Sequence, residues 1–218
     1  MSFVQNKNII LISVISMIIL SGFLFTAYKL TNGPAPGKTF PAVNIVKPTD
    51  HLKWAKDSKN ILVEYSDLQC PACKNFHNLI QQGIETTTIV NKVRFVYRHY
   101  PLTQIHQHAT EAAYAAEAAG KQGKFFEYTN ILFRDQAVWE KPGPATEYFL
   151  QAAGDLKLDL GQFRKDMSSK ETKDKVDADV LSGDQANVNA TPTFYLNGEK
   201  LDSIRSFEEF KQILQALK

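Results

Sequence analysis

The two cysteines of this chain lie only three positions apart, as Cys70 and Cys73 in the order Cys-Pro-Ala-Cys. A fold stapled by disulfides needs several cysteine pairs spread along the sequence, so this 218-residue chain must be held together by side-chain packing. Its length is sufficient for one domain with an apolar core, and for an insertion within that domain. The two cysteines are therefore expected to carry out chemistry.

The beginning of the chain is apolar, and residues 9–28 contain no charged side chain. A helix of about twenty residues, with a rise of about 1.5 Å each, spans a bilayer core of roughly 30 Å. A cleaved signal peptide usually has a shorter apolar run that ends in a small-x-small site, whereas Phe25-Thr26-Ala27 begins with a bulky residue. We therefore expect an uncleaved transmembrane anchor over residues 9–28.

The residues on either side of this run complete the predicted N-terminal part. Residues 1–8 are expected to form a cytoplasmic tail, because short N-terminal tails usually stay inside the cell. Residues 29–42 are rich in proline and glycine, which is typical of a linker. This orientation places residues 43–218 outside the cytoplasm, where a disulfide persists.

The rest of the chain alternates between strand and helix patterns. Residues 61–65 are apolar on both faces apart from Glu64, which predicts a central strand covered on both sides. Residues 104–187 are mostly helical in pattern and too numerous for a connection, so an inserted helical subdomain is expected. Strands separated by helices indicate an α/β sheet. Further strands are predicted at residues 43–46, 93–98 and 193–196, and a last helix at residues 207–217.

The cysteine pair is predicted to open a helix, because Pro71 is tolerated at the first helical position. Cys70 would then be the cap residue, facing unpaired N–H groups and the positive end of the helix dipole. This position stabilises a thiolate and lowers the pKa of Cys70. Cys73 would lie one turn inside the helix, less exposed, and able to attack a mixed disulfide.

Glu64 and the Thr191-Pro192 pair are further candidates. Glu64 lies six positions before Cys70 on a strand expected to be buried, and a buried carboxylate is costly unless its pKa rises. It is either a proton carrier for Cys73 or a strand-end glutamate that reaches solvent. Pro192 is either an ordinary proline that opens a strand or a cis proline. The cis form would place the backbone of Thr191 beside the cysteines, ready to pair with a substrate strand.

A metal site is the alternative from another functional class. Cys70, Cys73 and His77 would supply three ligands, although structural zinc usually has four. The 25 basic and 23 acidic residues nearly balance, so nucleic acid is not expected as a partner. Three further histidines follow the predicted strand at residues 93–98, and their loop context favours ordinary surface or capping roles: His99, His106 and His108.

Four segments together resemble the DsbA-like family of the thioredoxin superfamily. The segment EYSDLQCPACKNFH is similar to the active-site segment of the family, and FVYRHYPL is similar to its next strand. The run AAYAAEAAGKQGKFFEYTNILF resembles the start of the family's inserted helical domain, and VNATPTFYLNG resembles its cis-proline strand. The resemblance covers most of residues 43–218 with the segments in the right order.

The resemblance implies a thioredoxin fold with a helical insertion, and it implies roles for particular residues. Cys70 would be the nucleophile and Cys73 the resolving cysteine of a redox disulfide. Glu64 would be the buried acid, and Pro192 the cis proline. The sequence departs from the best-known family member at Ala72, where that protein has a histidine that stabilises the thiolate.

The expected function is therefore that of an extracytoplasmic enzyme that oxidises cysteines of secreted proteins through a mixed disulfide. The resemblance also suggests a quinone-linked membrane protein that reoxidises the pair, and a tethered form like that of bacteria without a free periplasmic version. No cofactor or metal is expected for this reaction. Two alternatives stay open: a disulfide reductase or isomerase of the same fold, and a metal-binding or metal-delivery protein.

Overall fold

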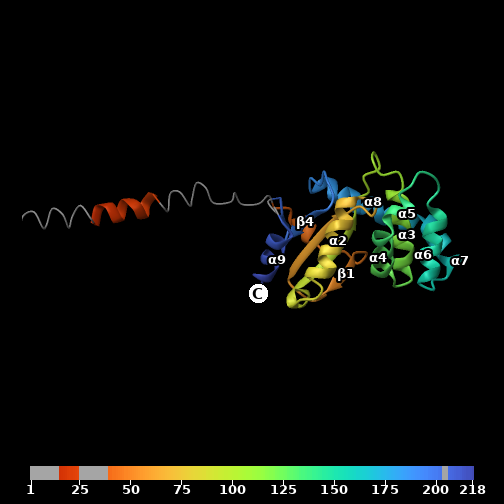
Figure 1. The fold of residues 1–218 in the computed structure, drawn as a ribbon, viewed down its shortest axis with the longest axis horizontal. Coiled ribbons are helices and arrows are strands. Elements are labelled where there is room, and N and C mark those ends of the chain that lie inside the picture. The colour runs from red at the N-terminus through yellow and green to blue at the C-terminus, as the bar shows by residue number, and fades with distance from the viewer. Residues whose placement is uncertain (1–14, 25–38, 203–205) are drawn as a thin grey trace, which may run out of the picture. The chain divides into compact units, whose positions relative to one another are not determined.

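The computed structural model describes residues 15–24, 39–202 and 206–218 (Figure 1). The chain divides into two compact units, Met1–Gly37 and Lys38–Lys218. Each unit is considered by itself, and the second contains the sheet, the cysteines and all of the candidate residues.

The predicted N-terminal part falls largely outside the described residues. This holds for the whole tail at residues 1–8 and for most of the linker at residues 29–42. Within the predicted anchor at residues 9–28, residues 15–24 are helical. None of the helices in the described part combines the length and the apolar character needed to cross a membrane.

The second unit is built on a five-stranded mixed sheet with the strand order β1-β3-β2-β4-β5. Strand β2 pairs with β3 in parallel and with β4 antiparallel, while β1 and β5 are antiparallel edge strands. The predicted α/β sheet is therefore confirmed. The strands are β1 His51–Trp54, β2 Asn60–Ser66, β3 Val93–His99, β4 Thr193–Leu196 and β5 Glu199–Lys200.

Strand β2 lies at the centre because its side chains are apolar on both faces. Leu62 and Val63 are both fully buried, and they point to opposite sides because successive side chains of a strand alternate. Leu62 belongs to the larger of two apolar clusters, and Val63 and Tyr65 belong to the smaller. With both faces covered, the strand holds the residues that follow it in a fixed position.

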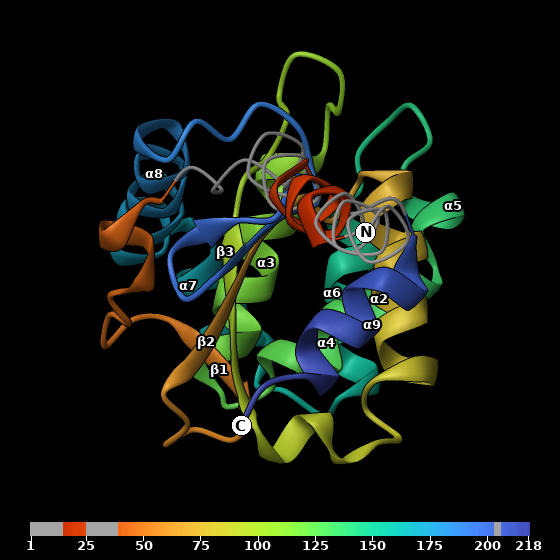
Figure 2. The same ribbon diagram turned by 90° about the vertical axis from the view of Figure 1, so that its left-hand side faces the viewer.

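Helices α2 (Pro71–Gly83) and α9 (Phe207–Gln215) cover one face of the sheet. Figure 2 shows them side by side, with α8 on the opposite side. The aromatic ring of Phe76 packs at 4.7 Å from that of Phe194 on β4 and at 5.1 Å from that of Phe210 on α9. These ring contacts fix α2, the helix that carries the cysteines, against the centre of the sheet.

Helices α3 to α8 follow one another between β3 and β4 and form the helical insertion. Figure 1 shows α3, α4, α6 and α7 gathered into one bundle. Helix α3 is central to it, because its buried alanines allow α4, α6, α7 and α8 to approach closely. The bounds are α3 Ala109–Lys121, α4 Phe125–Arg134, α5 Gln136–Trp139, α6 Thr146–Asp155, α7 Leu160–Ser168 and α8 Lys170–Gln185.

Two local predictions are wrong. Residues 43–46 are not a strand, and the short 3-10 helix η1, Pro41–Asn44, begins just before them. Pro41 favours this start, because proline fixes φ and lacks the N–H that a strand ladder would use. Strand β1 is missing from the prediction, because its four residues are only half-buried and give no clear apolar alternation.

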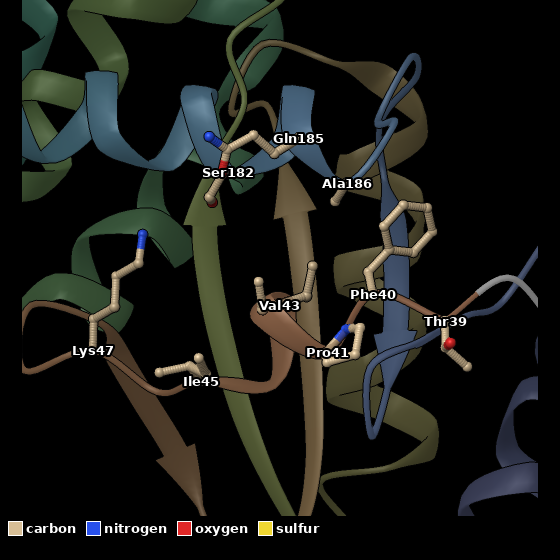
Figure 3. A pocket seen from close by; sticks show the side chains of 10 residues that line it. Thr39, Phe40, Pro41, Val43, Ile45, Lys47, Ser182, Gln185 and Ala186 are labelled. Atoms are coloured by element: carbon tan, nitrogen blue, oxygen red, sulfur yellow. The ribbon is translucent and has the colours of Figure 1, made fainter.

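An apolar groove of about 410 Å³ lies between η1 and the C-terminal end of α8 (Figure 3). Phe40, Val43 and Ala186 contribute to its lining, whereas neither cysteine does. The groove lies on the face of the sheet opposite α2, because Val43 and Ala186 belong to the smaller apolar cluster. It is therefore separate from the site described below.

A buried ion pair fastens the start of this unit to the central sheet. The side chains of Arg98 and Asp50 are both 0% exposed. The Arg98 guanidinium donates from Nε to Asp50 Oδ1 at 3.1 Å and from Nη2 to Asp50 Oδ2 at 2.9 Å. It also donates to the carbonyl oxygens of Val43 and Ile45, at 3.2 and 2.8 Å. Removing either partner would leave a buried charge uncompensated.

The variant Asp50→Ala is expected to lower the free energy of unfolding by about 3–5 kcal/mol, because the Arg98 guanidinium would stay buried without its carboxylate. Chemical denaturation followed by circular dichroism measures this loss. The matched control is Glu127→Ala, which removes a solvent-exposed ion pair with Lys124 and should have a much smaller effect. Equal losses in the two variants would contradict the assignment.

Candidate active site

The two cysteines lie at the N-terminus of α2, shortly after β2 ends. Cys70 caps the helix with an extended backbone, at φ −75° and ψ 123°, and Pro71 takes the first helical position. Cys70 is 7% exposed, whereas Cys73, one turn inside the helix, is 0% exposed. Both are free thiols, so the structure represents the reduced form of the pair.

Contacts at the start of the helix lower the pKa of Cys70 to about 5. The largest cause is a hydrogen bond from the Cys73 side chain, and backbone N–H groups of Cys73 and Ala72 add to it, while burial opposes the shift. The unpaired N–H groups and the dipole at a helix N-terminus favour negative charge. Cys70 is therefore a thiolate at neutral pH, the reactive form of a cysteine.

Burial has the opposite effect on the inner cysteine. It raises the pKa of Cys73 well above the ordinary value, and the neighbouring Cys70 raises it further. The backbone N–H of Asp67 donates to Cys73 Sγ at 3.5 Å and partly offsets this increase. The pair thus consists of an acidic outer thiol and an inner thiol that keeps its proton.

The loop before β4 lies against the outer cysteine. The peptide bond between Thr191 and Pro192 is cis. The carbonyl oxygen of Thr191 lies 3.4 Å from Cys70 Sγ, close enough to accept a hydrogen bond from the thiol form. The structure therefore brings the Thr191 backbone beside the sulfur of Cys70, although the two residues are 121 positions apart in the sequence.

Glu64 is buried on β2, at 4% exposure, so the alternative of a strand-end glutamate in solvent is excluded. Burial raises the pKa of Glu64 to about 7, although the nearby Ser66 side chain lowers it in part. A negative charge on Glu64 in turn raises the pKa of Cys73. The carboxyl group therefore changes its protonation close to neutral pH, within electrostatic reach of the inner thiol.

A cavity of about 20 Å³ lies beside Glu64 and is also lined by Tyr97 and His77. The Tyr97 hydroxyl and His77 Nε2 are buried without a hydrogen-bond partner among the described residues. Burial raises the pKa of Tyr97 and lowers that of His77 to about 4, so both groups are neutral at pH 7. Glu64 is thus the member of this trio that exchanges a proton near neutrality.

The geometry does not support the metal-site alternative. The ring of His77 packs on that of Phe133, with the ring centres 4.6 Å apart, and points into the cavity beside Glu64. Within the described part of the chain, no cluster of three or more His, Cys, Asp or Glu side chains could hold a metal ion. The proposed ligand set of Cys70, Cys73 and His77 is therefore not brought together.

The expected surface positions of His99, His106 and His108 are wrong, whereas the alternative of a capping position holds for His108, the N-cap residue of α3. His99 and His108 are buried, and the side chain of His106 is only 14% exposed. His99 Nε2 lies 3.1 Å from Glu117 Oε1, and His106 Nδ1 lies 2.7 Å from Asp67 Oδ2. The sequence around His99 and His106 resembles a polar loop, because the carboxylates that pair with these two histidines come from other parts of the fold.

The turn between β2 and α2 is held by residues that sequence reasoning missed. Gln136 Nε2 donates to the carbonyl oxygens of Leu68 and Cys70, at 2.9 and 3.1 Å. Gln69 Oε1 accepts from the backbone N–H of His108 at 2.7 Å. Gln136 is 66 positions from Cys70, so no local pattern could have indicated its role.

The family model described as Thioredoxin matches residues 47–216. Among curated proteins, the Na(+)/H(+) antiporter NhaA 3 of Salinispora tropica is 35% identical over 151 residues, which cover 69% of this chain and 22% of that protein. The Na(+)/H(+) antiporter NhaA 1 of Mycobacterium sp. (strain KMS) is 30% identical over 199 residues, or 88% of this chain and 30% of that protein. The chain thus spans less than a third of the length of these relatives.

Solved structures share the fold. Alpha-DsbA1 of Wolbachia pipientis has a TM-score of 0.66 at 21% identity, covering 80% of this chain and 95% of that one. Oxidised BdbD of Bacillus subtilis has a TM-score of 0.64 at 19% identity, covering 83% and 96%. These likenesses confirm the thioredoxin fold with a helical insertion that the sequence resemblance implied. Since the family model covers most of the chain, the protein belongs to the thioredoxin family.

Proposed function

We propose that this protein is an extracytoplasmic thiol–disulfide oxidoreductase that oxidises cysteine pairs of unfolded or partly folded secreted proteins. The observation that carries the proposal is the separation of its two thiols, with the pKa of Cys70 lowered to about 5 and that of Cys73 raised. Proteins with this fold include a thiol-disulfide exchange protein of Wolbachia pipientis and a thiol-disulfide oxidoreductase of Corynebacterium matruchotii, which supports the proposal.

The reaction starts from the oxidised protein, in which Cys70 and Cys73 form a disulfide. A substrate thiolate attacks Cys70 Sγ, the bond between the two protein sulfurs breaks, and Cys73 leaves with the electron pair as a thiolate. Glu64, whose pKa is about 7, supplies the proton that this sulfur takes up. The product of this step is a mixed disulfide between the substrate and Cys70.

The second step releases the oxidised substrate. A second substrate thiolate attacks the substrate sulfur of the mixed disulfide, and Cys70 leaves as the thiolate that the start of α2 stabilises. Two electrons have then passed from the substrate to the protein. In both steps the Thr191 backbone, which lies beside Cys70 Sγ, would pair with the extended substrate chain and hold its sulfur in place.

The direction of transfer follows from the acidity of Cys70. A lowered thiol pKa stabilises the reduced form of the pair and makes the disulfide a stronger oxidant. The low pKa arises from contacts of Cys70 with Cys73, with Thr191 and with backbone N–H groups, so a histidine at position 72 is not required for it. Turnover then needs a partner that removes two electrons from the dithiol, for which we propose a quinone-linked membrane protein.

The thiolate absorbance of the reduced protein is expected to titrate with a midpoint near pH 5. This is the pKa of Cys70, which the contacts at the start of α2 lower. The Cys70→Ser variant should lose this titration, whereas the matched variant Cys73→Ser should keep a thiolate at Cys70 and accumulate the mixed disulfide. Equilibration with glutathione should give a reduction potential above about −200 mV. A potential near about −270 mV would instead indicate a reductase.

The raised pKa of Glu64 is expected to make the fold less stable as the pH rises. Below about pH 4.5 the carboxyl group is protonated in both the folded and unfolded states, but its folded pKa is about 7. Between these values only the unfolded state ionises, so the free energy of unfolding falls, by roughly 3 kcal/mol at pH 8. The variant Glu64→Gln should lose this decrease and exchange disulfides more slowly.

Denaturation of the parent and of Glu64→Gln at pH 4 and pH 8 tests this expectation. Other carboxyl groups titrate in both proteins, so the difference between the two pH dependences isolates Glu64. Identical pH dependences would show that Glu64 is not a buried acid with a raised pKa.

The extracytoplasmic location and the membrane anchor are part of the same proposal. They are supported by the uncharged apolar run at residues 9–28. The full chain, expressed in bacteria, should stay in the membrane fraction after alkaline extraction, and Cys70 should react with a thiol reagent that does not cross the membrane. Release by alkaline extraction would exclude an anchor, and protection of Cys70 until the cells are lysed would place the domain inside.

A further inference from the structure

The backbone of Asp67 contacts both cysteines. Its N–H donates to Cys73 Sγ at 3.5 Å, and its carbonyl oxygen accepts from the backbone N–H of Cys70 at 3.1 Å. A displacement of this one residue would therefore alter the backbone position of Cys70 and the surroundings of the Cys73 sulfur together. What holds Asp67 in place is consequently relevant to the reactivity of the pair.

The side chain of Asp67 is 0% exposed and accepts three hydrogen bonds. Its Oδ1 accepts from the backbone N–H of Gln69 at 2.7 Å, within the same turn. Its Oδ2 accepts from the backbone N–H of Leu102 at 2.8 Å and from His106 Nδ1 at 2.7 Å. The carboxylate thus ties the turn that carries Cys70 to the segment that follows β3.

His106 is the side-chain donor among these three and the one that a substitution can remove. Because an ionised carboxylate only accepts hydrogen bonds, the ring nitrogen of His106 is the donor. A buried carboxylate that loses a donor is destabilised, so without His106 the backbone of Asp67 is held less firmly against the cysteines. Losing His106 would therefore loosen the contact that positions Cys73, whose side-chain hydrogen bond is the largest cause of the low pKa of Cys70.

We propose that Asp67 and His106 form a clamp that positions the dithiol and helps to set its reduction potential, so that both are positioning residues of the site. This rests on the proposed function, in which Cys73 leaves as a thiolate when a substrate sulfur attacks Cys70. The clamp fixes the position of the Asp67 N–H, which already contacts Cys73 Sγ in the reduced form. Negative charge develops on this sulfur when Cys73 leaves, so the N–H stabilises it there. Pre-organised donors of this kind act most strongly in a buried site.

The test compares His106→Ala and His106→Gln with the parent in the full chain. The measured quantities are the equilibrium constant for exchange with glutathione and the pH midpoint of the Cys70 thiolate absorbance. His106→Ala should shift the equilibrium about tenfold toward a weaker oxidant, about 30 mV for a two-electron couple, and should raise the midpoint. His106→Gln keeps a side-chain N–H donor and should recover most of both values.

The matched control is His51→Ala, which removes a histidine–carboxylate pair of the same kind elsewhere in the fold. His51 Nε2 lies 2.9 Å from Glu117 Oε1, and its side chain is 17% exposed, against 14% for His106. His51 lies on the edge strand β1, stacked on the ring of Phe125. His51→Ala should reduce thermal stability without changing the potential or the thiolate midpoint.

Three outcomes separate the proposals. A parent protein that does not exchange disulfides with glutathione would contradict the proposed function. The clamp alone would be contradicted if the parent exchanges disulfides normally and the reduction potential of His106→Ala shifts no more than that of His51→Ala. A His106→Ala protein that does not fold would also overturn the clamp, because His106 would then serve the fold rather than the dithiol.

Discussion

The passage from β2 into α2 is the constraint on which the rest of the site depends. Strand β2 is covered on both faces, so its end is fixed by packing, and the helix that begins at Pro71 leaves its first N–H groups without intrahelical partners. The sulfur of Cys70 lies against these donors, and the second thiol supplies a further hydrogen bond. The reactive thiolate is thus a product of backbone geometry, and it does not need a basic side chain between the cysteines.

Burial determines which of the groups near the cysteine pair keep their protons. It raises the pKa of both Cys73 and Glu64, and a charge on Glu64 makes ionisation of Cys73 still less favourable. The two groups therefore resist carrying negative charge at the same time. A proton that leaves Glu64 for the Cys73 sulfur moves within a shielded region, while Cys70 is held in the mixed disulfide and becomes a thiolate only when the oxidised substrate leaves.

The local parts of the site could be predicted from the sequence, whereas the contacts that support it could not. The helix start follows from Pro71, and the burial of Glu64 follows from the apolar run around it, because both depend on neighbouring residues. His99 and His106 looked like loop residues, since their partners, Glu117 and Asp67, come from a distant helix and from the turn before the cysteines. The same limit explains the missing strand β1, which is defined by its pairing with β3.

The helical insertion is built into the site through the same long-range contacts. Gln136, on α5, bonds the carbonyl oxygen of Cys70, and the Glu117 carboxylate on α3 lies within 2.9 and 3.1 Å of the ring nitrogens of His51 on β1 and His99 on β3. Each of these polar groups would be buried without a partner if the insertion were displaced, which is costly. Gln136 therefore fixes the backbone at Cys70 only when the insertion is docked on the sheet. The cost of leaving buried polar groups unsatisfied thus favours the docked insertion, which in turn supports the turn that carries Cys70.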